Sequence, residues 1–199
     1  MESASIRQAL RRGAFHAVLG ATFATALLLL PQLLVHAALA IATVGFLIFE
    51  AIRLRVPSLR RWFSALFAPL LRKEEEDDFT GSSYFLIGCL LTALAFPQNI
   101  ACLAILFLSF GDPAATVVGI WKGHRKLWGR SAEGDIACLI VCMLVGILFA
   151  VILKNPPLIV AIVGAIFATL FQALPLRLND NLTIPLGSTA AMMALSILM

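Results

Sequence analysis

The sequence contains few charged residues. Only 13% of its 199 residues are Asp, Glu, Lys or Arg, whereas a soluble domain carries about a quarter. Hydrophobic residues make up 61% of the chain. This balance argues against a soluble globular protein and for a membrane protein. The net charge of +4 is modest, so we interpret the basic excess as a determinant of membrane orientation rather than of nucleic-acid binding.

Several functional signatures are also missing. The chain has no GxxxxGK[ST], HExxH or GxSxG motif, so nothing supports a P-loop, a zincin or an α/β-hydrolase site. Its four cysteines form no CxxC pair and lie in apolar runs, which favours a role as small packing residues. The charged N-terminus precedes an apolar run without a small-residue cleavage pattern. We therefore expect a retained first span and no signal peptide.

Long apolar runs, by contrast, are abundant. Seven segments approach the roughly 20 residues needed to cross a bilayer, namely residues 14–30, 33–52, 80–96, 99–120, 135–153, 157–176 and 183–199. With seven spans, all basic residues except Lys154 fall on one side, which the positive-inside rule makes cytoplasmic. We predict an all-α integral membrane protein, residues 1–199 forming one transmembrane catalytic domain, with the N-terminus inside and the C-terminus outside.

One cytoplasmic segment is amphipathic. Residues 58–71 place apolar side chains at spacings of three and four, with arginines opposite, which predicts an interfacial helix in the headgroup region. It serves either as a surface anchor or as a wall beside a lipid-entry groove. The acidic run that follows, residues 74–78, is more typical of a solvated linker than of a metal site.

An aspartate ends the fourth apolar run. Asp112 precedes Pro113, a helix-start signature that predicts a break in this span. Ala115, Gly119 and Gly123 then follow at spacings of four, which permits close backbone approach. A basic group comes next: Lys122, His124, Arg125, Lys126 and Arg130. A phosphate-donor site needs a carboxylate for magnesium, cations and small residues, although a helix cap followed by positive-inside anchoring explains the same pattern.

More polar residues fall on the same predicted face. Asn179, Asp180 and Asn181 form either a simple turn or a second carboxylate site, for a metal or for activating a hydroxyl group. Two polar pairs lie at helical spacing: Arg12 with His16, and Glu50 with Arg53. The simpler interpretation of each pair is a local ion pair or a headgroup anchor. All the expected chemistry therefore lies at the cytosolic face.

Together these segments resemble the CTP-dependent lipid-alcohol kinases. This family includes dolichol, polyprenol, phytol and farnesol kinases and the CTP-using diacylglycerol kinase, and is related to the phosphatidate cytidylyltransferases. The resemblance covers nearly the whole chain and rests on the order and spacing of six segments: RRGAFH (11–16), FEAIR (49–53), TGSSYFLIG (80–88), GDPAATVVGIWKGHRK (111–126), GRSAEG (129–134) and NDNLTIPLGS (179–188).

The resemblance implies transfer of the CTP γ-phosphate to a lipid hydroxyl with Mg²⁺ or another divalent cation. The partners are then CTP, a membrane lipid alcohol and the bilayer, with no nucleic acid. The implied catalytic residues and Mg²⁺ ligands are Asp112, Glu133 and Asp180. The implied nucleotide and phosphate contacts are Gly111, Gly119, Lys122, Gly123, Arg125, Lys126, Arg130, Ser131, Gly134 and Asn181. The implied supporting residues are Arg12, His16, Glu50 and Arg53.

Two positions depart from the family pattern. Arg130 replaces the signature lysine, and Gln172 stands where relatives often carry a glutamate. The Ser-x-Glu-Gly and Asn-Leu-Thr-Ile-Pro-Leu segments resemble the dolichol and polyprenol branch of the family. This resemblance favours a polyprenol or dolichol acceptor over phytol, farnesol or diacylglycerol. The expected location is a bacterial inner membrane or a membrane like the endoplasmic reticulum, with the site in the cytosol.

Two other functions compete with the kinase. A cytidylyltransferase would attack the α-phosphate of CTP, but the Asp-Arg-x-Asp-Ser ending of those enzymes is missing. A non-enzymatic lipid transporter or scaffold would place polar residues at mid-membrane and on both sides, whereas here they gather on one side.

Overall fold

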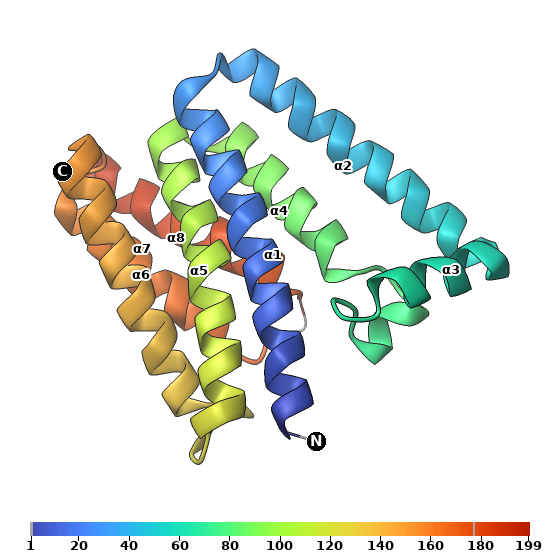
Figure 1. Ribbon diagram of the computed structural model, residues 1–199. Coiled ribbons are helices and arrows are strands. Elements are labelled where there is room, and N and C mark those ends of the chain that lie inside the picture. The colour runs from blue at the N-terminus through green and yellow to red at the C-terminus, as the bar shows by residue number, and fades with distance from the viewer. Residues whose placement is uncertain (1, 177) are drawn as a thin grey trace.

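The computed structural model describes residues 2–176 and 178–199 and consists almost entirely of helices (Figure 1). Arg177, one of the basic residues behind the predicted orientation, lies outside the described residues. The elements are α1 (Glu2–Leu29), α2 (Gln32–Arg55), α3 (Pro57–Phe67), the 3₁₀ helix η1 (Lys73–Glu76), α4 (Gly81–Ala95), α5 (Gln98–Lys122), β1 (Lys126–Leu127), β2 (Arg130–Ser131), α6 (Ala132–Leu153), α7 (Leu158–Ala173) and α8 (Asp180–Leu198).

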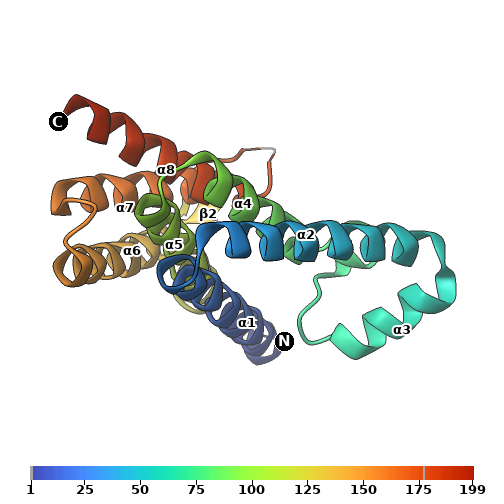
Figure 2. The ribbon, with the colours of Figure 1, turned by 90° about the horizontal axis from the view of Figure 1, so that it is seen from above.

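Helix α5 is the centre of the bundle. It packs between α1 and α6 and also contacts α8, which lies against α4 and α7. The core is concentrated on α5, where the side chains of Leu103, Ile105, Phe107 and Leu108 are completely buried. Helices α2 and α3 stand to one side of this bundle, as the view from above shows (Figure 2). The four cysteines are buried and free, which confirms them as packing residues.

All seven predicted apolar segments are helical. Five helices are long and apolar enough to cross a membrane: α1 from Ser5, α2, α5, α6 and α8. Helices α4 and α7, with 15 and 16 residues, are shorter than the usual 17 to 25 residues of a spanning helix. Seven crossings and the orientation of the termini therefore stay predictions.

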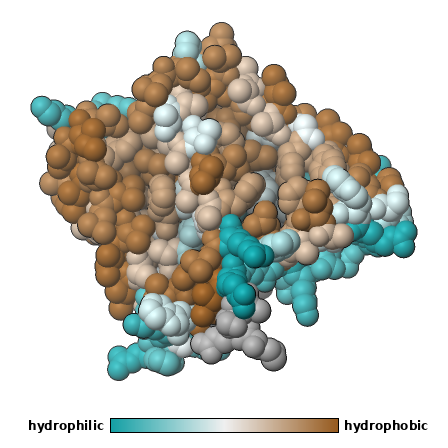
Figure 3. Space-filling model, viewed as in Figure 1, coloured by the Kyte–Doolittle hydropathy of each residue, from teal (hydrophilic) through white to brown (hydrophobic). Residues whose placement is uncertain are grey.

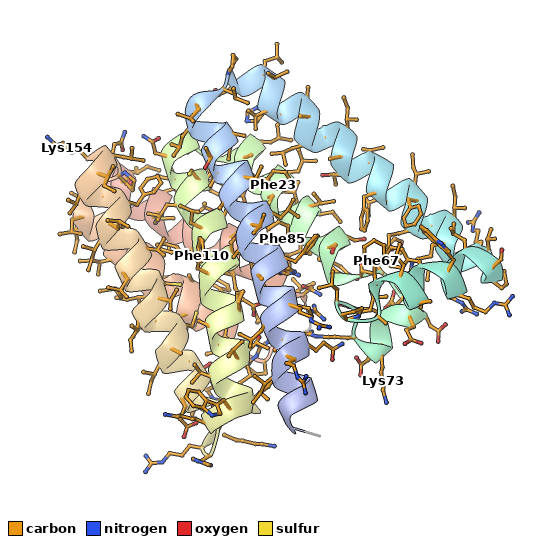
Figure 4. All side chains as sticks on the ribbon, viewed as in Figure 1. Phe23, Phe67, Lys73, Phe85, Phe110 and Lys154 are labelled. Atoms are coloured by element: carbon orange, nitrogen blue, oxygen red, sulfur yellow. The ribbon has the colours of Figure 1, made fainter. Side chains whose placement is uncertain are left out.

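Apolar residues cover much of the outer surface (Figure 3). On α2, Leu33, Ile41 and Ile48 are exposed, as are Ile140 and Leu144 on α6. Large exposed apolar areas of this kind mark a membrane-facing surface. Lys73 and Lys154 lie at opposite ends of the molecule (Figure 4), in agreement with the predicted separation of Lys154 from the other basic residues.

The chain differs from the sequence-based expectation at the end of α5. Instead of breaking at Asp112, α5 continues through Pro113 to Lys122. A helix-interior proline removes one hydrogen bond, but α5 is packed on both sides, and such packing routinely overrides local propensity. After α5 the basic segment forms a hairpin, in which Lys126 pairs with Ser131 and Gly129 has a φ of +88°. This hairpin is not predicted by the sequence pattern.

Side-chain amides join the helices at the end opposite this hairpin. The Gln98 amide donates to the carbonyl oxygen of Leu27, and the Gln32 amide donates to Gln98 Oε1 at 2.8 Å. Pro31 and Pro97 lie directly before α2 and α5. The α1–α2 and α4–α5 connections are therefore tied together there.

A close contact between α4 and α8 gives the first test of the fold. A Cβ atom added at Gly88 would overlap the carbonyl oxygen of Asn181, whereas one added at Gly45 on α2 meets nothing within 4 Å. We expect Gly88→Ala to cost roughly 1–3 kcal/mol, as overpacking typically does, and Gly45→Ala to leave stability unchanged or slightly higher. Denaturant unfolding in detergent measures both, and equal unfolding midpoints for the two variants would contradict this packing.

Candidate functional site

A charged pocket of about 430 Å³ lies at the end of the bundle where η1 and the start of α8 meet α1 and α5. It brings together residues from distant parts of the sequence. Its charged lining residues are Arg12, Arg72, Glu75, Asp112, Arg130 and Asp180, and His16, Asn179 and Asn181 also line it. Six of the predicted site residues are therefore joined here: Arg12, His16, Asp112, Arg130, Asp180 and Asn181.

Asp112 differs from the other two acids of this pocket, Glu75 and Asp180. Among the described residues, none donates a hydrogen bond to its carboxylate. Three guanidinium groups act on it electrostatically, those of Arg12, Arg72 and Arg130. Because α5 runs on beyond it, Asp112 does not cap a helix and its oxygens stay available to a ligand.

Asp180 is held by Arg130. The Arg130 Nη2 atom donates to both Asp180 carboxylate oxygens at 2.8 and 2.6 Å, which connects the hairpin to the first residue of α8. Asn179 caps this helix, because its side chain accepts from the Asn181 backbone at 3.0 Å. The Asn181 amide in turn donates to the carbonyl of Gly81 at 2.9 Å, so α4 fixes the start of α8.

Glu75 is a pocket residue that the sequence pattern does not predict. It forms an ion pair with Arg12 at 3.3 Å, and it accepts hydrogen bonds from the backbones of Gly81 at 3.0 Å and Arg72 at 2.8 Å. The acidic run was predicted to be a solvated linker, but η1 turns this one side chain inward. No local signal separates Glu75 from its acidic neighbours.

Glu50 and Arg53 lie outside the pocket and position a segment that lines it. They form a fully buried ion pair at 2.8 Å, and neither lines the charged pocket. Arg53 also donates to the backbone carbonyls of Glu75, Glu76 and Asp78, at 3.3, 3.0 and 2.6 Å. The pair therefore holds the segment that carries Glu75, which is more than a headgroup anchor would do.

Several predicted contact residues lie elsewhere. Glu133, expected beside Asp112 and Asp180, does not line the charged pocket. Its carboxylate instead accepts hydrogen bonds from the Ser131 hydroxyl at 2.8 Å and from the His124 and Arg125 backbones at 3.2 Å, so it fixes the hairpin. The Lys122 ammonium lies over the indole ring of Trp121, 4.3 Å from the ring centroid.

Four glycines of the motif stand where two elements pack closely. A Cβ at Gly111 would lie 2.5 Å from Cys142 Sγ, inside the bundle, and one at Gly134 would lie 2.6 Å from the carbonyl oxygen of Ala115. Gly119 and Gly123 face Ser131. The predicted small-residue stripe thus lets α5 approach the start of α6 closely.

A smaller pocket of about 300 Å³ adjoins the charged one and shares Thr116, Ile120 and Arg130 with it. Lys126, Ser131 and four glycines line it, together with Asp135 and Gln172. Both Asp135 oxygens and Gln172 Oε1 are buried without a hydrogen-bond partner among the described residues. Buried acceptors are rarely left unpaired, and a bound cation or donor group would satisfy them.

The described residues contain no group of three His, Cys, Asp or Glu side chains placed to hold a metal ion. Asp112 and Asp180 nevertheless line the same pocket, beside two asparagine amides. Mg²⁺ in phosphate-transfer sites is commonly bound by one or two carboxylates plus substrate phosphates. This donor set fits Mg²⁺ without Glu133.

The fold and the pocket define an all-α membrane protein with a charged site at one end of its bundle. No family model and no solved structure matches the chain. An uncharacterized protein of Rickettsia prowazekii is 30% identical over 166 residues, which cover 80% of this chain and 81% of that protein. The chain belongs to the same family as this Rickettsia protein.

Two further relatives have named activities. CTP-dependent diacylglycerol kinase 1 of Schizosaccharomyces pombe is 32% identical over 81 residues, or 41% of this chain and 34% of the kinase. The protein of the same name from Eremothecium gossypii is 30% identical over 104 residues, or 49% and 33%. The matches thus span about a third of the length of these kinases.

Proposed function

We propose that this protein is a CTP-dependent lipid kinase, which transfers the γ-phosphate of CTP to the hydroxyl group of a membrane lipid. The similarity to CTP-dependent diacylglycerol kinases supports this assignment. The observation that carries it is the charged pocket, where Asp112, which accepts no hydrogen bond from any described residue, lies among three arginines. Catalysis of phosphoryl transfer depends on this combination of positioning and charge stabilisation.

The proposed reaction assigns a task to each group. The lipid oxygen forms a bond to the γ-phosphorus, the bond from that phosphorus to the β,γ-bridging oxygen breaks, and CDP leaves. Asp112 accepts the hydroxyl proton, because Asp180 is already neutralised by Arg130. Arg12, Arg72 and Arg130 bind the phosphate oxygens and stabilise the charge that develops on them.

Asp112 and Asp180 are also the residues that would hold Mg²⁺. A metal ion held there would neutralise negative charge on the phosphate groups of CTP. Arg130 and the Asn179 cap keep Asp180 at the pocket edge. Glu133 acts indirectly, by fixing the hairpin from which Arg130 projects.

We further propose seven membrane crossings, with the pocket at the cytosolic face. The gathering of basic residues at the pocket end supports this orientation. The acceptor is a lipid alcohol: the sequence resemblance favours a polyprenol or dolichol, and the curated relatives are named for diacylglycerol.

An assay with the purified protein in detergent tests the assignment. With [γ-³²P]CTP, Mg²⁺ and either polyprenol or diacylglycerol, we expect label in a lipid phosphate and release of CDP. Phytol and farnesol extend the acceptor panel, and ATP serves as the donor control. Pyrophosphate release with formation of a CDP-lipid would instead identify a cytidylyltransferase, and label in no lipid would refute the kinase assignment.

A further inference from the structure

A second large cavity adjoins the charged pocket and differs from it in chemistry. It has a volume of about 540 Å³ and lies between α1, α2, α3 and α4. Its lining is mainly apolar and aromatic, with major contributions from Phe15, Leu19, Phe23, Phe46, Phe63 and Phe67. We call it the apolar chamber. Phe23 on α1 and Phe67 on α3 mark two of its walls (Figure 4).

Aromatic contacts hold α3 in place as a wall of this chamber. The ring centroids of Phe63 and Phe67 are 4.6 Å apart, and those of Phe49 on α2 and Phe63 are 5.5 Å apart. The Arg53 guanidinium lies 5.1 Å from the centre of the Phe63 ring. Phe63 is buried, whereas Trp62 on the same helix is exposed. These contacts fix Phe63 and Phe67 in the wall of the chamber.

The chamber and the charged pocket meet. Arg12, His16, Glu75 and Gly81 line both cavities. The Arg12–Glu75 ion pair is therefore the boundary between an apolar space and a space that contains Asp112. A molecule that fills the chamber with a hydrocarbon chain would place its polar end at this boundary.

We propose that the apolar chamber binds one hydrocarbon chain of the lipid acceptor, with its hydroxyl group at the Arg12–Glu75 end. This inference rests on the proposed function. The volume lies within the range of about 300–1,000 Å³ usual for ligand pockets, and the apolar walls disfavour the charged nucleotide. Burial of each methylene group contributes about 0.8 kcal/mol, so chamber length sets a preference among acceptor chains.

Ala42 on α2 offers a way to fill the chamber. It is a small lining residue, and Ala42→Trp would place an indole ring in this space. Its neighbour Ile41 is 74% exposed and is not a lining residue, which makes Ile41→Trp the matched control. We expect Ala42→Trp to raise KM for the lipid acceptor at least tenfold and to leave KM for CTP unchanged, and Ile41→Trp to change neither.

A binding measurement separates this inference from the proposed function. The 199-residue chain in nanodiscs is labelled with a long-chain alcohol that carries an alkyl diazirine, and the labelled peptides are identified by mass spectrometry. We expect labels on chamber residues of α1 to α4, reduced at least tenfold by Ala42→Trp. Competition by unlabelled polyprenol and diacylglycerol then distinguishes the two sources of the chain.

The outcomes are distinct. Chamber labelling that Ala42→Trp blocks, in a protein without CTP-dependent lipid phosphorylation, would support the chamber and refute the kinase. Undiminished labelling in Ala42→Trp, or labels only on outward residues of α6 such as Ile140 and Leu144, would overturn the chamber inference. A change of oligomeric state in that variant with labelling intact would show instead an interface between copies, and would also overturn it.

Discussion

Asp112→Asn is expected to lower kcat of the proposed lipid kinase by about 10²- to 10⁴-fold, the usual contribution of a positioned acid–base group. The substitution keeps the size of the side chain and removes its charge. Among the described residues no hydrogen bond depends on this carboxylate, so we expect the variant to fold normally. Initial rates with [γ-³²P]CTP, together with size-exclusion chromatography in detergent, measure both properties.

Asp77→Asn is the matched control for this experiment. Asp77 is an exposed carboxylate, paired with Arg60 at 2.5 Å on the surface, and it lines neither the charged pocket nor the apolar chamber. The same chemical change there should leave turnover near the native rate. Native-like activity of Asp112→Asn would place the reacting groups elsewhere in the molecule.

Arg53→Ala is expected to produce the largest loss of stability. It would leave the Glu50 carboxylate buried without its partner, and removing one member of a buried ion pair typically costs about 3–5 kcal/mol. It would also free three backbone carbonyls of the η1 region. We therefore expect a lower unfolding midpoint in detergent and a release of Glu75 from Arg12, seen as weaker binding of CTP.

Two variants make this test specific. Arg60→Ala removes an exposed arginine that pairs with Asp77, and surface pairs contribute roughly 0–1 kcal/mol. Arg53→Lys keeps the charge but lacks the planar fork, so we expect a midpoint between those of the native protein and Arg53→Ala. Equal midpoints for Arg53→Ala and Arg60→Ala would show that the buried pair has no structural role.

The sequence predicts the helices and part of the site, for a clear physical reason. Apolar segments of sufficient length are recognisable without any tertiary information, and all seven are helical in the structure. The placement of basic residues then puts Asp112 and Asp180 on one face, although they lie 68 positions apart in the sequence. Both line one pocket.

What the sequence does not show depends on tertiary contacts. Glu75 differs from its acidic neighbours only because Arg53 fixes the backbone around it. The expected break at Asp112 was wrong because packing of α5 outweighs the local Asp-Pro signal. Gln172 was recognised as a departure from the family pattern, yet only the structure shows that Asp135 supplies a carboxylate to the same small pocket.

The amide contacts among Gln32, Gln98 and Leu27 have a mechanical consequence. They join α1, α2 and α5 at the end of the molecule far from the charged pocket. Helix α3 follows the opposite end of α2. At 1.5 Å per residue the 24-residue α2 is about 36 Å long. A rotation of about 5° at this joint would therefore move the α3 end of α2 by roughly 3 Å, so contacts at one end of the molecule bear on the width of the apolar chamber at the other.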